Sequence, residues 1–88
     1  MRPLSARVTI ASVSSAPVRG GFTRFTVAAE RVENTGRMDH WLTFTTLNDF
    51  KASLCLRARE TGVPLDVTYR STGYFDADLL SAELVEAR

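Results

Sequence analysis

Rings and guanidinium groups recur in the first half of the chain at positions that could share one surface. Two sets have a spacing of two residues: Phe22, Arg24 and Thr26, and then Trp41, Thr43 and Thr45. This spacing places side chains on one face of a β-strand. Aromatic faces stack on flat ligands, and the planar fork of arginine suits phosphate. The two sets therefore predict a surface that stacks rings and holds anions.

Four further residues extend this candidate surface: Arg19, Arg37, Arg70 and Tyr74. Arg19 precedes the Gly20-Gly21 pair, and Arg37 follows the Thr35-Gly36 turn, so both could reach phosphates from loops. Arg70 points outward by strand parity, and Tyr74 lies in the last turn. Solvated loop charge is the competing interpretation of the arginines. For Trp41 the competing interpretation is a ring that caps a barrel end or fills a subunit interface.

Charge is nearly balanced over the 88 residues, with a formal net charge of +1. Its distribution is uneven, because residues 1–40 carry six arginines against three acidic residues, whereas residues 41–88 carry five basic against seven acidic residues. Ten of the eleven cations are arginine. A net charge of +1 is too small to indicate a polyanion partner by itself. The arginine side chain suits phosphate, but a bias of composition toward arginine explains the pattern at least as well.

Catalytic and metal-binding chemistry find no support in these residue types. His40 has no acid or nucleophile at a fixed spacing, and Asp76 and Asp78 flank a turn rather than a cleft. Cys55, the lone cysteine, can form neither an internal disulfide nor a Cys/His metal set, and we expect it at the edge of the core. We therefore predict a protein that is not an enzyme and needs no cofactor.

The elements that must position these side chains follow from periodicity. Alternation predicts five strands, over 7–13, 22–32 and 39–47, then from Leu65 after Pro64, and finally over 77–85 with a bulge. From Asn48 to Thr61 the period lengthens, and Phe50, Leu54 and Ala58 define the expected buried face of a helix, with Leu47 one turn earlier. Asn48 is the expected N-cap, and Gly62 the residue that ends the helix.

The order β-β-β-α-β-β is that of the OB fold, an all-β, five-stranded Greek-key barrel with one helix between strands 3 and 4. We expect it to form a single domain over residues 1–88. No apolar run is long enough to span a bilayer, and no signal peptide is evident, so a soluble, cytoplasmic protein is expected.

The local sequence resembles the bacterial single-stranded-DNA-binding proteins over roughly residues 7 to 72. The similar features are the strand Phe25–Arg31, the Thr35-Gly36 turn, Trp41 in strand 3, and a helix over 50–60 followed by Gly62. Departures are a shorter loop between strands 4 and 5, a first strand without the usual glycine, and the lack of the acidic C-terminal tail.

This resemblance implies binding of single-stranded DNA without sequence preference, in replication or recombination of a bacterial, phage or plasmid genome. It also implies a homo-oligomer, dimer or tetramer, and assigns the stacking role to Trp41. Binding is expected to concentrate near Trp41 and Arg24, away from Glu30. RNA stays open as a ligand, and the alternative function is an OB-like module for protein–protein interaction or structural oligomerisation.

Overall fold

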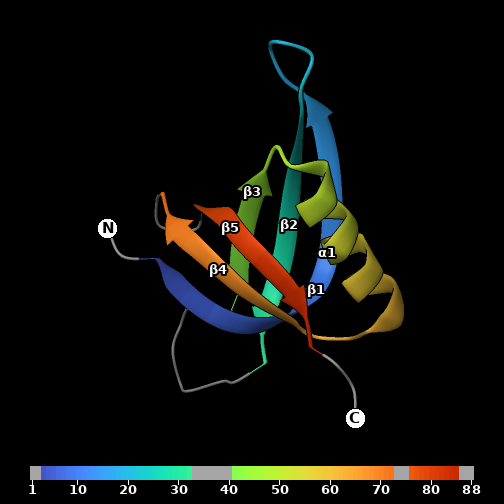
Figure 1. The fold of residues 1–88 in the computed structure, drawn as a ribbon, viewed down its shortest axis with the longest axis vertical. Coiled ribbons are helices and arrows are strands. Elements are labelled where there is room, and N and C mark those ends of the chain that lie inside the picture. The colour runs from blue at the N-terminus through green and yellow to red at the C-terminus, as the bar shows by residue number, and fades with distance from the viewer. Residues whose placement is uncertain (1–2, 33–40, 73–75, 86–88) are drawn as a thin grey trace.

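The computed structural model describes residues 3–32, 41–72 and 76–85 and contains five strands and one helix in the predicted order (Figure 1). These elements are β1 (Leu4–Pro17), β2 (Thr23–Arg31), β3 (Trp41–Thr46), α1 (Asp49–Thr61), β4 (Leu65–Ser71) and β5 (Asp76–Leu84). The main difference in extent is β1, because residues 14–17, which lie beyond the expected strand 7–13, pair with residues 23–26 of β2 and prolong the strand. The turn itself lies at Gly20 and Gly21, which both have positive φ.

The strands close into a barrel in the order β1-β2-β3-β5-β4. The long β1 makes closure possible, since its residues 4–8 pair with β4 and its residues 8–17 pair with β2. β3 and β5 are parallel, whereas all other described pairs are antiparallel. A closed five-stranded barrel with one helix between β3 and β4 is the OB-like arrangement that the sequence predicts.

The core fills the barrel with side chains from alternate positions of each strand. Its largest fully buried members are Phe44, Leu65, Val8, Val27 and Cys55. The rings of Phe44 and Tyr69 meet at 5.2 Å between centroids, tilted by 57°, an arrangement that aromatic pairs favour. The Tyr69 hydroxyl accepts a 2.7 Å hydrogen bond from Arg31, so the buried phenol keeps a polar partner. The predicted bulge in the last strand is present, with Leu80 as the extra residue opposite β4.

The ends of α1 are the ones that the sequence predicts. The side chain of Asn48 accepts from the amide of Lys51, and Gly62 ends the helix in the left-handed conformation at φ 72°. Both features satisfy backbone groups that a helix end leaves unpaired.

The buried face of α1 differs from the prediction. Ala52, Cys55 and Ala58 face the core, whereas Phe50 is 71% exposed and Leu54 is only partly buried. Small side chains three residues apart bring the helix backbone close to the barrel end, and a phenyl ring on that face would hold it off. Cys55, expected at the core edge, is therefore fully buried, and desolvation raises the pKa of its thiol to about 11.

Candidate nucleic-acid interface

The outward face of β2 and β3 carries the residues whose spacing suggested a binding surface. Arg24 and Thr26 project from β2 on the side opposite the buried Val27, and Trp41 and Thr43 project from β3 opposite Phe44. Trp41 is 52% exposed. Antiparallel pairing of these two strands therefore gives one continuous outer surface.

The register of the two strands separates the indole from the guanidinium that was expected beside it. Trp41 pairs with Glu30, and Thr45 pairs with Thr26. Arg24 lies six residues along β2 from Glu30, about 20 Å at ~3.3 Å per residue. The expected neighbourhood of Trp41 and Arg24 is therefore wrong, because a period of two fixes which face a side chain occupies but not the offset between strands. The immediate charged neighbour of Trp41 on β2 is a carboxylate.

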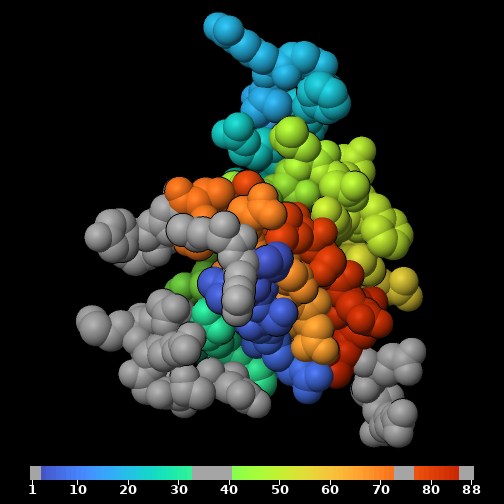
Figure 2. All heavy atoms as spheres, turned by 60° about the vertical axis from the view of Figure 1, so that its left-hand side comes forward, coloured from blue at the N-terminus to red at the C-terminus, as the bar shows by residue number. Residues whose placement is uncertain are grey.

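The other end of the face gathers three of the predicted residues into a surface groove. Phe22, Arg19 and Arg24 line this groove at the tip of the β1–β2 hairpin. The tip, in blue and cyan, stands above the body of the molecule, with the yellow-green start of α1 next to it (Figure 2). We call it the hairpin groove; its remaining lining residues are Pro17, Val18 and Leu47.

The ring of the hairpin groove lies close to the backbone of the turn at Gly20. Gly20 has φ 87°, and a Cβ at this position would meet two ring carbons of Phe22 at 3.3 Å. A residue other than glycine would therefore be strained and would crowd the ring. Phe22 is 59% exposed and Leu47 is 53% exposed. The groove thus combines an apolar surface for a flat ring with two guanidinium groups for anions.

A row of polar side chains crosses the middle of the outer face. Following the pairing of neighbouring strands, it consists of Ser14, Thr26, Thr45, Asp78 and Arg70, and we call it the polar row. The Thr45 hydroxyl donates to a carboxylate oxygen of Asp78 at 3.3 Å. Asp78 and Arg70 are both exposed. The row offers hydroxyls, one carboxylate and one guanidinium to a ligand lying across the sheet.

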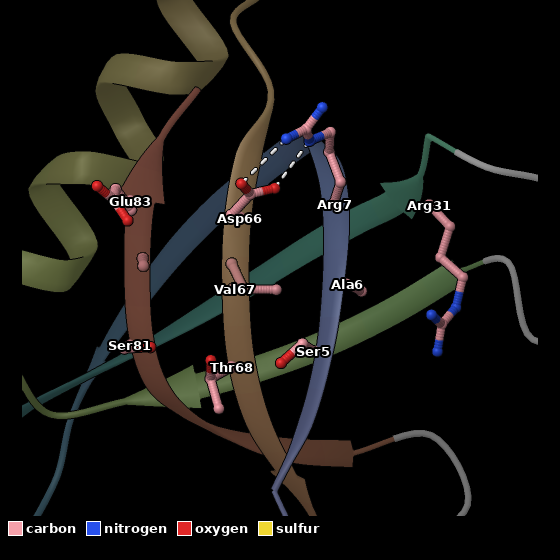
Figure 3. Close-up of a pocket in the computed structure, with 10 residues that line it drawn as sticks. Ser5, Ala6, Arg7, Arg31, Asp66, Val67, Thr68, Ser81 and Glu83 are labelled. Atoms are coloured by element: carbon pink, nitrogen blue, oxygen red, sulfur yellow. Dashed lines mark hydrogen bonds and ion pairs between the residues drawn. The ribbon is translucent and has the colours of Figure 1, made fainter. Parts of the chain in front are cut away.

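A second hollow, which the sequence did not suggest, lies over β1, β4 and β5 (Figure 3). Ser5 and Thr68 leave space at its centre, and Arg7 spans its rim to reach Asp66 with hydrogen bonds of 2.8 and 3.2 Å. The Arg7 guanidinium holds the pKa of Asp66 below its ordinary value. Arg31 also lines the hollow, but Arg7 is paired with Asp66 and a second carboxylate, Glu83, lies there, so the hollow is a weaker candidate for anions than the hairpin groove. In the sequence, the only indication of this hollow is that the polar residues Asp66 and Thr68 alternate along β4.

Several sequence-based predictions fall on residues outside the described ranges. These are Arg37 and Tyr74 of the candidate surface, together with the Thr35-Gly36 turn and His40. Within the described residues, no three His, Cys, Asp or Glu side chains gather as they would around a metal ion. No helix there has the length and apolar content that crossing a bilayer requires.

The fold and these surfaces define an OB-like barrel whose outer β2–β3 face has an exposed ring at each end. Comparisons with family models, curated proteins and solved structures find no match to this chain.

Proposed function

We propose that this protein binds single-stranded nucleic acid, with DNA as the principal ligand, along the outer face of β2 and β3. The observation that carries the proposal is the hairpin groove, where the exposed ring of Phe22 lies with Arg19 and Arg24. Single-strand binding needs aromatic faces for the bases and cations for the backbone, and this groove supplies both. The OB-like barrel supports the same proposal, since such barrels present this face to oligonucleotides.

The strand would run from the hairpin groove, across the polar row, to Trp41. Stacking is available to every base, so contacts with Phe22 and Trp41 tolerate most sequences. Arg19, Arg24 and Arg70 would hold phosphates, and the hydroxyls of Thr26 and Thr43 would contact the strand between the rings. Self-association into a dimer or tetramer would add contacts along one strand and compensate for the low net charge.

Titration with oligo-dT at several salt concentrations tests the proposal. We expect the logarithm of the association constant to fall with the logarithm of salt concentration with a slope of about −2, from three arginine–phosphate contacts at ~−0.7 each. Arg24→Ala should make the slope shallower by about 0.7. Arg57→Ala, which removes an exposed arginine on α1 away from this face, is the matched control. Absence of binding at low salt would refute the proposal.

A protein-binding role is the competing candidate because three large apolar side chains near the hairpin groove and the start of α1 are exposed. Phe22, Leu47 and Phe50 are each more than half exposed. A mainly apolar protein contact would be nearly insensitive to salt, so the same titration separates the two functions. Chromatography with light scattering on the wild type and Trp41→Ala tests the oligomeric alternative, in which this ring is buried between subunits.

A further inference from the structure

One charged group beside the proposed face, on the neighbouring strand β5, is unexplained by phosphate binding and stacking. Asp78 lies in the polar row, is exposed, and has the opposite sign to the arginines that would hold the strand. Thr45 donates to one of its oxygens at 3.3 Å. An ionised carboxylate has about four acceptor positions, so this bond leaves most of them available. A group that repels phosphate in this place needs a different partner.

The bases of a single strand can provide that partner, because their Watson–Crick edges are exposed when the strand is unpaired. Guanine presents two neighbouring donors on this edge, the N1 hydrogen and the N2 amino group, which match the two oxygens of a carboxylate. Cytosine and adenine present one amino group beside a ring acceptor. Thymine and uracil present a single N–H between two carbonyl oxygens. These oxygens and a carboxylate repel each other.

We infer that Asp78 selects the base at one position of the bound strand and favours guanine over thymine or uracil there. This inference rests on the proposed function and adds a base preference to binding that is otherwise tolerant of sequence. Arg70 supports it, since it is the cross-strand partner of Asp78 on β4. Its guanidinium can hold the phosphate of the nucleotide whose base edge meets the carboxylate. Thr45 fixes the orientation of the carboxylate through its hydrogen bond.

Four strands of about twelve nucleotides, within the usual range of about 4–16 per OB fold, test the inference. They are all-dT, alternating dG/dT, alternating dC/dT, and alternating dI/dT, in which hypoxanthine keeps the N1 hydrogen but lacks the N2 amino group. Alternation places the test base near Asp78 in every second register, so a shift of one nucleotide is enough to bring it there. We expect the dG/dT strand to bind about ten-fold tighter than all-dT, as for one bidentate base contact, with the dI/dT strand in between.

Asp78→Asn should abolish the ten-fold preference for the dG/dT strand over the all-dT strand. It should weaken binding of dG/dT and strengthen binding of all-dT. Glu83→Gln is the matched control, because it makes the same change of charge on β5 at an exposed position outside the polar row. The control should leave the ratio near ten. The comparison of dG with dI uses the wild-type protein and is independent of how the variants fold.

Two results would overturn the inference while leaving the proposed function intact. One is equal binding of all four strands by the wild type. The other is an Asp78→Asn variant that binds every strand tighter by the same factor, which would make Asp78 a source of repulsion alone. If none of the four strands binds at low salt, the proposed function itself is refuted, and the base preference falls with it.

Discussion

The distance between the two exposed rings, Phe22 and Trp41, predicts that they need strands of different length. A short strand contacts one ring, and only a longer strand contacts both. Phe22 lies eight residues along the chain from Glu30, the cross-strand partner of Trp41. At ~3.3 Å per residue this is about 26 Å, the length of about eight nucleotides stacked at ~3.4 Å. A strand of about four nucleotides therefore cannot stack on both rings. The hairpin groove should hold such a short strand, because the arginines lie there and a carboxylate lies beside Trp41.

Phe22→Ala should then weaken binding of every strand, whereas Trp41→Ala should weaken only the longer ones. Loss of one stacking contact costs about 1–3 kcal/mol, a factor of roughly 5 to 150 in affinity. For strands of about four nucleotides we expect the full factor for Phe22→Ala and no change for Trp41→Ala. For strands of about twelve nucleotides both factors should appear, and the two free energies should add because the side chains lie well beyond ~10 Å from each other.

Fluorescence anisotropy with dye-labelled oligo-dT of graded length measures both effects without relying on the tryptophan signal. Phe50→Ala is the matched control, since it removes an equally large and even more exposed ring that does not line the hairpin groove. Equal penalties for Phe22→Ala and Trp41→Ala at every length would refute the register argument. Binding that neither substitution alters would remove stacking from the mechanism altogether.

Two further predictions concern stability. Gly62→Ala should destabilise the fold by about 1–2 kcal/mol through left-handed backbone strain alone, because no atom lies within 4 Å of the added Cβ. Thermal unfolding should show this loss, and Gly62→Asn should show a smaller one. An unchanged unfolding midpoint would contradict the prediction. For Cys55, burial raises the thiol pKa from 9.0 to about 11, so the unfolded chain loses the proton first and stability falls as pH rises from 9 to 11. Urea unfolding should show this alkaline loss in the wild type relative to Cys55→Ala, and a difference independent of pH would argue against it.

The faces of the strands could be predicted from the sequence because burial repeats every second residue. Val27 and Phe44 are buried, and their neighbours Thr26 and Thr43 point outward, as the alternation indicates. The limits of the helix were equally accessible, since Asn48 and Gly62 satisfy local requirements of the backbone. The barrel order followed from the number and sequence of elements together with the general rules for OB-like folds.

The offset between β2 and β3 could not be predicted in the same way, because alternation is unchanged when one strand slides by two residues. Such a slide keeps every side chain on its face and changes only its neighbour. The pairing of Trp41 with Glu30 depends on the closure of the whole barrel, which also requires β3 to run beside β5. The sequence therefore placed Arg24 and Trp41 on the correct side of their strands but beside the wrong neighbours.

The error at the helix has a direct consequence for the site. Periodicity assigned Phe50 and Leu47 to the core because they are large and apolar, yet the barrel end accepts only the small face of Ala52, Cys55 and Ala58. With the helix set close by these small residues, Leu47 stays outside and becomes part of the hairpin groove beside Phe22. The side chain that packing excludes from the core thus extends the apolar floor on which a base would stack. The exposed leucine beside an exposed phenylalanine and two arginines is the arrangement on which the proposed binding at the hairpin groove depends.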